Sequence, residues 1–189
     1  MKKRVITEEV ILECALNFVI ENGIDNLNAR SLAKMLKCST QPIYLSFINM
    51  DDLKFKLLAR AKRIFSLYLT ERLKDYDSLF MGYIASYIKF AYDYPKLYEF
   101  MYLKMECNNT KEDIAYNETI IKEIAKAGNY SYQIAEKFYI QSFIYAHGFA
   151  TQIVTGYIKW DFNVILEFLN DEFMALKLKY KGENLDGSN

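Results

Sequence analysis

The chain has 189 residues, of which 52% are hydrophobic and 25% are charged, a composition that supports one small and one larger folded domain. The 24 basic and 24 acidic side chains balance, which excludes a histone-like basic tail. The charge is still uneven, because residues 1–63 hold 11 Lys or Arg against 7 Asp or Glu, a net of +4, and residues 64–189 hold 13 against 17, a net of −4. Only two prolines and seven glycines interrupt apolar spacing that is helical almost throughout, so we expect an all-α protein.

The first predicted helix begins just after Thr7, which is a suitable N-cap. Glu8 and Glu9 place carboxylates in the first turn, where the helix dipole favours them. Asn22 and Gly23 indicate the end of this helix. The apolar side chains between these points share one helix face, and they are Ile11, Cys14, Ala15, Phe18 and Val19.

Two short helices separated by a tight turn follow within residues 28–47. Asn28 is a suitable N-cap for the first of them and Ser39 for the second. Pro42 falls in the first turn of the second helix, where its missing N–H breaks no helical hydrogen bond. The buried positions are predicted from helical spacing, and they are Leu32, Ala33 and Leu36, then Ile43 and Phe47.

The exposed side chains of the second short helix favour contact with nucleic acid. Gln41 and Tyr44 lie three residues apart on one face, and Thr40 lies four residues before Tyr44. A glutamine side chain matches the donor and acceptor of adenine in the major groove, and the hydroxyls of Ser39, Thr40 and Tyr44 suit phosphates or base edges. By residue type alone, a polar cap on a surface helix explains Ser39, Thr40 and Gln41 equally well.

A fourth helix completes a pattern that resembles a known family. Asn49 followed by Asp52 suggests a capping box for a long helix over residues 51–73. With this helix included, residues 5–60 resemble the DNA-binding domain of the TetR family of transcriptional regulators. The residues that carry the resemblance are Gly23 with Ile24; Arg30, Leu32 and Ala33; Ser39, Tyr44 and Phe47; and Asp51, Asp52 and Leu53.

The resemblance implies a helix-turn-helix DNA-binding domain over residues 1–63, joined through a long helix to a helical effector-binding and dimerisation domain over residues 64–189. It also implies a homodimeric, ligand-responsive regulator of transcription, more often a repressor, whose partner is double-stranded operator DNA. In such a protein Asn28 and Tyr44 would contact phosphates, and Thr40 and Gln41 would contact bases. The residues that the resemblance places at the DNA are Lys3, Arg4, Asn28, Arg30, Ser39, Thr40, Gln41 and Tyr44.

Four positions depart from the family pattern. Lys37 stands at a turn position that glycine usually holds, so this lysine is expected to adopt a positive φ at a cost of roughly 1 kcal/mol. Leu45 and Ser46 replace aromatic or histidine side chains, and Met50 replaces a basic residue. These changes leave open a second function, a helical protein-binding adaptor that keeps the fold but binds DNA weakly or not at all.

The larger half carries most of the aromatic residues, which either form ordinary core or line a pocket between helices. The step from His147 to Gly148, with Tyr94 and Pro95 earlier, loosely resembles one C-terminal subgroup of the TetR family. His147 is the only histidine, and the alternatives for it are a satisfied interior side chain, a ligand contact or a pH switch. The candidate effector-binding residues are Tyr87, Phe90, Tyr98, Met101, Tyr102, Met105, Phe143 and His147.

Dimerisation is expected through two long apolar-striped helices over residues 131–157 and 162–180, as in the family. Residues 138–158 are uncharged, but two glutamines, two threonines, a serine and the histidine argue against a membrane span. Three cysteines without metal-ligand spacing predict reduced thiols in a cytoplasmic protein. With one histidine and no phosphate loop or nucleophile motif, we expect no enzyme, no cofactor and no metal.

Overall fold

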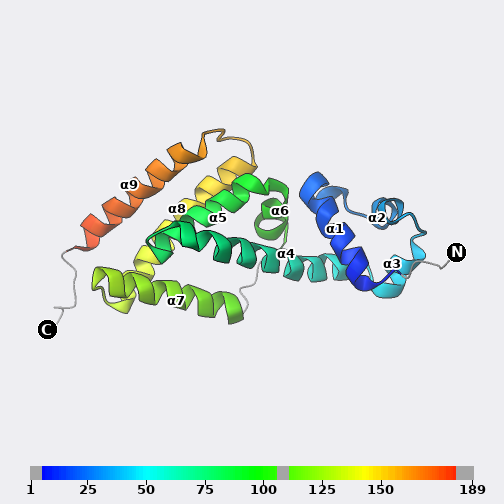
Figure 1. The fold of residues 1–189 in the computed structure, drawn as a ribbon, viewed down its shortest axis with the longest axis horizontal. Coiled ribbons are helices and arrows are strands. Elements are labelled where there is room, and N and C mark those ends of the chain that lie inside the picture. The colour runs from blue at the N-terminus through cyan, green and yellow to red at the C-terminus, as the bar shows by residue number, and fades with distance from the viewer. Residues whose placement is uncertain (1–5, 106–110, 182–189) are drawn as a thin grey trace. The chain divides into compact units, whose positions relative to one another are not determined.

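A computed structural model describes residues 6–105 and 111–181, and within these ranges it contains nine α-helices and no strand (Figure 1). The all-α prediction is confirmed. In chain order the elements are α1 (Glu8–Asn22), the 3₁₀ turn η1 (Ile24–Asn26), α2 (Ala29–Leu36), α3 (Gln41–Ser46), α4 (Met50–Arg72), the 3₁₀ turn η2 (Leu73–Asp75), α5 (Leu79–Asp93), α6 (Pro95–Glu99), the π-helical turn η3 (Phe100–Lys104), α7 (Lys111–Gly128), α8 (Tyr132–Val154) and α9 (Phe162–Tyr180).

The described chain divides into two compact units. We call residues 6–67 with 94–105 the N-terminal unit, and residues 68–93 with 111–181 the C-terminal unit. The N-terminal unit therefore includes a segment that follows α5 in the sequence, which the sequence pattern did not suggest. Helix α4 belongs to the N-terminal unit up to Leu67 and to the C-terminal unit from Tyr68.

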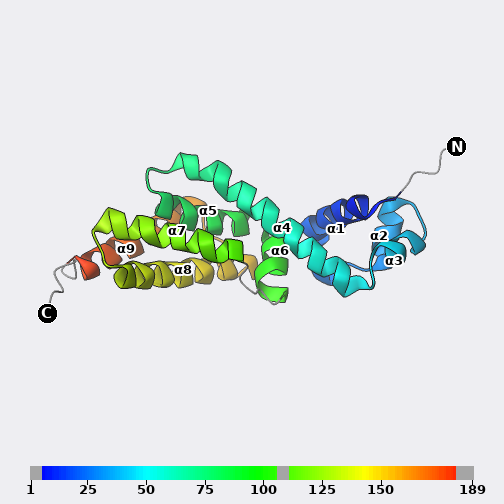
Figure 2. The same ribbon diagram turned by 90° about the horizontal axis from the view of Figure 1, so that it is seen from below.

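The N-terminal unit is built on α1, against which α2, α3 and α6 pack (Figures 1 and 2). Thr7 is the N-cap as predicted, since its hydroxyl accepts a hydrogen bond from the N–H of Val10 at 3.4 Å. Ile11, Ala15 and Val19 repeat along the helical face and have no exposed surface. Burying such side chains contributes roughly 1.5–3 kcal/mol for each large one, so this face dominates the stability of the unit.

Ion pairs between α1 and the first half of α4 add a smaller contribution. Lys56 lies 2.9 Å from Glu8, and Arg60 pairs with Glu9. All four side chains are at least partly exposed, so each pair is worth about 1 kcal/mol or less. Helix α4 begins one residue before its predicted start, with the carboxamide oxygen of Asn49 accepting the N–H of Asp51 at 3.0 Å and that of Asp52 at 2.9 Å.

The C-terminal unit is built around α5, which packs against α7, α8 and α9. Figures 1 and 2 show α5 beside α8, and α7 packs against both of these helices. Every residue from Gly82 to Ile88 is buried. Helix α5 is apolar on nearly all of its faces, as expected for a helix that neighbouring helices cover. Helix α8 begins after its N-cap Ser131, close to the predicted start, but it ends earlier than the predicted residue 157. Gly156 adopts a φ of 76°, and Tyr157 donates its N–H to the carbonyl of Gln152 at 2.9 Å, which closes the helix.

Candidate functional site

Asn28 sets the position of α2 in the N-terminal unit. Its carboxamide oxygen accepts the N–H groups of Arg30 and Ser31, both at 3.0 Å, and the Ser31 hydroxyl accepts the N–H of Asn28 at 3.0 Å. This reciprocal capping box confirms Asn28 as N-cap. The side-chain nitrogen of Asn28, Nδ2, also donates to the carbonyl of Asn26 at 3.2 Å. Both the oxygen and the nitrogen of this carboxamide are therefore used within the protein. Arg30 lies in the first turn of α2 and is exposed.

Lys37 forms the turn between α2 and α3. It has φ 53° and ψ 46°, the left-handed conformation predicted for this position. Cys38 donates its N–H to the carbonyl of Ala33 at 3.0 Å, and Lys37 donates to the carbonyl of Lys34 at 3.3 Å. This is the Schellman arrangement, which usually has glycine at the left-handed residue. The turn ends α2 sharply and directs the chain into α3.

Helix α3 is short and is anchored by its apolar side. Ile43 and Phe47 are 1% and 3% exposed, and the ammonium of Lys56 lies 5.1 Å from the centre of the Phe47 ring. Pro42 falls in the first turn, as predicted. The prediction that Ser39 is the N-cap is wrong, because Thr40 is the N-cap and its carbonyl accepts the N–H of Ile43 at 3.1 Å.

The polar side chains predicted to contact DNA lie on the exposed side of this region. Gln41 is exposed, Tyr44 is 57% exposed, and Ser39 is exposed in the turn. Thr40 is partly exposed. A compact core thus presents an amide and several hydroxyls on one short helix and the turn before it, an arrangement that suits the edge of a nucleic acid groove. The predicted contacts Lys3 and Arg4 lie outside the described residues.

The candidate effector-binding residues divide between the two units. Tyr98, Met101, Tyr102 and Met105 belong to the N-terminal unit, where Tyr98 and Met101 are buried and the rings of Tyr98 and Tyr102 are 4.8 Å apart. Phe90, in the C-terminal unit, is fully buried and packs edge-on against Tyr68 at 5.3 Å.

Tyr87, Phe143 and His147 come together in the C-terminal unit, and we call them the Tyr87 cluster. The Tyr87 hydroxyl lies 2.8 Å from Nδ1 of His147. The Phe143 ring is 5.4 Å from that of Tyr87 and 6.1 Å from that of His147. Tyr87 is buried, whereas Phe143 and His147 are partly exposed, and burial lowers the pKa of His147 below its ordinary 6.5.

Further tyrosines extend this cluster, and two of them, Tyr116 and Tyr139, were not predicted from the sequence. Tyr139 stacks on Phe143 at 6.0 Å and on Tyr83 at 6.5 Å, and Tyr83 lies 5.5 Å from Tyr116. Burial raises the pKa of both Tyr116 and Tyr139. The Tyr116 hydroxyl is buried without a hydrogen-bond partner among the described residues. An unpaired buried hydroxyl costs free energy that a ligand could recover by bonding to it.

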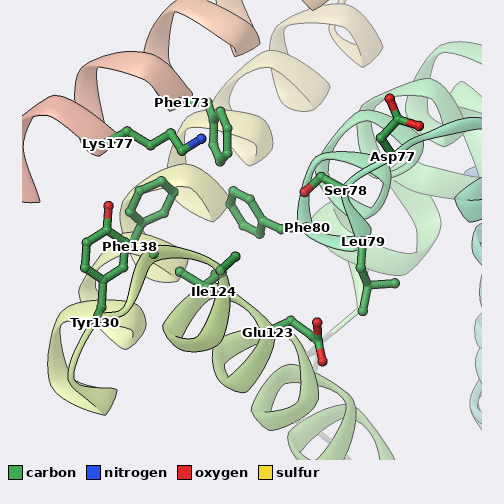
Figure 3. Close-up of a pocket in the computed structure, with 12 residues that line it drawn as sticks. Asp77, Ser78, Leu79, Phe80, Glu123, Ile124, Tyr130, Phe138, Phe173 and Lys177 are labelled. Atoms are coloured by element: carbon green, nitrogen blue, oxygen red, sulfur yellow. The ribbon is translucent and has the colours of Figure 1, made fainter. Parts of the chain in front are cut away.

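A cavity of about 310 Å³ lies elsewhere in the C-terminal unit, and none of the candidate effector-binding residues lines it (Figure 3). The residues that line it come from the loop before α5, from the turn between α7 and α8, and from the helices α5, α7, α8 and α9. They are Asp77, Ser78, Leu79, Phe80, Glu123, Ile124, Ala127, Gly128, Tyr130, Phe138, Phe173 and Lys177. Because they come from several separate parts of the chain, no local motif marks this cavity in the sequence.

Among the described residues, no three His, Cys, Asp or Glu side chains are placed to hold a metal ion. Cys14 and Cys38 are free thiols, and burial raises the pKa of Cys14, while Cys107 lies outside the described residues. None of the helices in residues 6–105 and 111–181 is both long and apolar enough to cross a membrane.

No protein-family model matches the sequence, and no curated protein matches it. Solved structures do match. One is a TetR variant from Acinetobacter baumannii AYE in complex with minocycline, at a TM-score of 0.67 and 17% identity, covering 94% of this chain and 98% of that one. Another is a protein of unknown function from Rhodococcus sp. RHA1, at a TM-score of 0.72 and 17% identity, covering 94% and 97%. The chain has a TetR-like fold.

The positions that depart from the TetR pattern lie on the surface of this TetR-like chain. Leu45 is 79% exposed on α3, and Ser46 and Met50 are partly exposed. Two further apolar side chains that the sequence pattern did not single out are exposed nearby in the sequence: Ile48 at 88% and Phe55 at 70%. Three large apolar groups therefore add to the exposed surface of residues 39–55, which is less polar than the motif alone suggests.

Proposed function

We propose that the protein is a sequence-specific DNA-binding regulator of transcription, a repressor that acts as a homodimer. The observation that carries this proposal is the exposed pair Gln41 and Tyr44 on α3, a helix anchored by the buried Ile43 and Phe47. In a helix-turn-helix domain the second helix enters the major groove, and its first turns contact base edges. In the proposed complex Gln41 and Thr40 contact bases, and Arg30, Ser39, Tyr44 and the leader residues Lys3 and Arg4 contact the backbone.

Asn28 acts differently in this proposal. Its carboxamide accepts two N–H groups of α2 and donates to the carbonyl of Asn26. It therefore holds the first turn of α2, and a phosphate contact by Asn28 stays a prediction. Losing an N-cap costs roughly 0.5–2 kcal/mol, so Asn28→Ala would loosen the turn that presents Arg30.

Dimerisation through α8 and α9 is supported by apolar side chains left exposed on both helices. On α8, Ile140 and Ile144 are 47% and 65% exposed and lie one turn apart. On α9, Met174 and Leu178 are 49% and 69% exposed and also lie one turn apart. Large apolar side chains exposed in pairs on a helix are available for a protein interface, and two copies supply the two recognition helices that paired half-sites need.

A small-molecule effector is proposed at the Tyr87 cluster, with Tyr87, Phe143 and His147 as contacts. The similar TetR variant was solved with minocycline bound, which supports a ligand-binding role for the fold. The cluster combines aromatic faces with hydroxyl and imidazole groups, as ligand pockets do. The effector would act by favouring one of two conformers that differ in their fit to DNA.

One observation favours a second function, the protein-binding adaptor. Leu45, Ile48 and Phe55 are 79%, 88% and 70% exposed, and large apolar side chains at such exposure are typical of surfaces that bind proteins. An adaptor would keep the fold and lack sequence-specific affinity for DNA. An enzymatic function is not proposed.

The deciding experiment is footprinting of the purified full chain on the DNA upstream of its own gene. We expect a protected site with two-fold related halves and an affinity that falls as salt rises. A dimer-breaking variant, Ile144→Glu, should lose the footprint, whereas Ile114→Glu should keep it, since Ile114 is a 50% exposed isoleucine on α7. Absence of any specific footprint from the dimeric wild type would contradict the proposal and favour the adaptor.

A further inference from the structure

The cavity of about 310 Å³ in the C-terminal unit has an aromatic wall. The Phe80 ring lies 5.6 Å from Phe138 and 5.8 Å from Phe173, and Phe138 and Phe173 are 5.6 Å apart. Tyr130 stacks on Phe138 at 6.2 Å. Figure 3 shows these rings grouped together, with Ile124 below them. The wall is thus apolar, but its ring faces carry the negative electrostatic potential that attracts cations.

The charged residues of the lining favour a cation as well. Asp77 and Glu123 contribute two carboxylates and Lys177 one ammonium, a net charge of −1. Figure 3 shows Lys177 beside the aromatic rings, and the two acids on the other side, beside Ser78 and Leu79. Neither Asp77 nor Glu123 forms an ion pair with any residue that the structure describes, so both carboxylates can pair with a ligand.

Lys177 shows that this wall already accepts a positive charge. Its ammonium lies 4.9 Å from the centre of the Phe173 ring, within the range of a cation–π interaction. The lysine is exposed and reaches the ring on a flexible side chain. A ligand whose apolar body lies against these rings can place its charge near two carboxylates that Lys177 does not contact at ion-pair distance.

We infer that this cavity binds a small organic cation with a flat apolar body, the body lying against Phe80, Phe138 and Ile124 and the charge near Asp77 and Glu123. The size fits, because a cavity of roughly 150 Å³ lined by apolar side chains holds a benzene ring, and this cavity has about 310 Å³. The site is separate from the Tyr87 cluster and does not depend on the proposed DNA binding, so either can fail without the other.

The test uses phenyltrimethylammonium, its uncharged isostere tert-butylbenzene, and benzoate, each titrated into the full chain. Binding is followed by NMR through the methyl signals of Leu79 and Ile124, both of which line the cavity. The cation should shift these signals and bind at least about fivefold more tightly than the isostere, because only the cation is attracted to the carboxylates of Asp77 and Glu123. Benzoate should bind most weakly.

Charge variants then locate the binding groups. Glu123→Gln should weaken phenyltrimethylammonium binding by about two- to fivefold, as expected for an exposed ion pair. Glu118→Gln is the matched control on α7, since Glu118 pairs with Lys122 at 3.9 Å and does not line the cavity, and it should leave binding unchanged. Lys177→Met should strengthen binding, because it removes a like charge from the lining of the same cavity.

Three outcomes would overturn the inference. Equal affinity for phenyltrimethylammonium and tert-butylbenzene would show that the cavity binds apolar ligands without selecting a positive charge. Tighter binding of benzoate, weakened by Lys177→Met, would assign an anion. Absence of any shift at Leu79 and Ile124 in a chain with a well-dispersed NMR spectrum would mean that the cavity takes no ligand of this class.

Discussion

The phenolic hydroxyl of Tyr87 lies 2.8 Å from Nδ1 of His147, and burial lowers the pKa of this histidine below 6.5. The tyrosine hydroxyl can donate to an unprotonated Nδ1 or accept from a protonated one, so this contact is compatible with either charge state of His147. Burial is therefore what favours the uncharged histidine. This makes His147 a titratable group in the Tyr87 cluster.

The first prediction concerns the pH dependence of stability. Because the folded pKa of His147 is depressed, the unfolded chain binds more protons than the folded chain as pH falls below about 6.5. The free energy of unfolding should therefore be fully retained above that pH and should decrease as the pH falls toward the folded pKa. Urea unfolding between pH 8 and pH 5 measures it. His147→Gln should lose part of this acid dependence, and an identical pH profile for the two proteins would contradict the assignment.

The second prediction concerns the recognition surface. Gln41→Ala should weaken specific operator binding by about 1–3 kcal/mol per half-site, because a good side-chain contact with a base is worth that amount. Binding to unrelated DNA should change little, since that binding depends on phosphates. Fluorescence anisotropy with the footprinted site measures both. Gln133→Ala, an exposed glutamine in the first turn of α8, is the control, and equal operator affinity in the two variants would count against Gln41.

A third prediction follows from the left-handed conformation of Lys37, whose φ is 53°. Lys37→Gly should stabilise the protein by about 0.5–1 kcal/mol, because glycine adopts this conformation without the clash of a Cβ atom. Lys34→Gly, three residues earlier inside α2, removes the same charge and should destabilise by about 1 kcal/mol. Urea unfolding of both variants and wild type at the same pH measures whether the free energy of unfolding rises in Lys37→Gly and falls in Lys34→Gly. A loss of stability in Lys37→Gly would show that the left-handed turn is not strained.

The fourth prediction concerns the contact between Gly128 and Tyr130. A Cβ atom at Gly128 would lie 1.9 Å from Cε2 of the buried Tyr130 ring, so the ring would have to move. Gly128→Ala should therefore cost about 1–3 kcal/mol, as overpacking usually does. A double-mutant cycle with Tyr130→Ala checks the cause. If the cost is the same in the Tyr130→Ala background, the close approach is not responsible.

The fifth prediction concerns Glu172, whose two carboxylate oxygens each lie 3.1 Å from the Ser142 hydroxyl between α8 and α9. Burial raises the pKa of Glu172 above its ordinary 4.5, and the Ser142 hydrogen bond only partly opposes this. The folded protein thus binds a proton more readily than the unfolded chain, so stability decreases as pH rises through this range. Glu172→Gln should be more stable than wild type at pH 7 and equal to it at pH 4. Thermal unfolding of both proteins at pH 7 and pH 4 measures the difference. Equal stability of Glu172→Gln and wild type at both pH values would contradict the prediction.

Much of the fold could be predicted because its signals are local. Thr7 and Asn28 cap helices through hydrogen bonds that reach only two or three residues along the chain, so residue type and spacing suffice. The prediction for the cap of α3 is one residue too early, because Ser39 and Thr40 are equally suitable cap residues and Thr40 makes no side-chain cap hydrogen bond, so residue type places this helix start only to within one position. Lys37 could be predicted because a turn at this point demands a left-handed residue whatever its side chain.

The sites proposed for ligands could be predicted only in part. Tyr87, Phe143 and His147 were among the candidates, but Tyr116 and Tyr139 were not, because neither lies in a distinctive local pattern. The cavity between Phe80, Tyr130 and Phe173 combines residues that lie far apart in the sequence, and only the packing of the helices brings them together. The candidate effector-binding residues also include side chains of the buried core, such as Phe90 and Tyr98, because helical spacing does not distinguish core from pocket.

The segment 94–105 has a practical consequence for engineering. Lys96 donates to the carbonyl of Glu21, Lys104 lies 3.0 Å from Asp25, and the Tyr102 ring is 6.0 Å from that of Phe65. The N-terminal unit, which carries the proposed DNA-binding surface, is thus discontinuous in sequence. Excising it as a single stretch, or grafting it onto another regulator, would leave α1 without the helix that packs against it, so a working chimera has to carry both pieces.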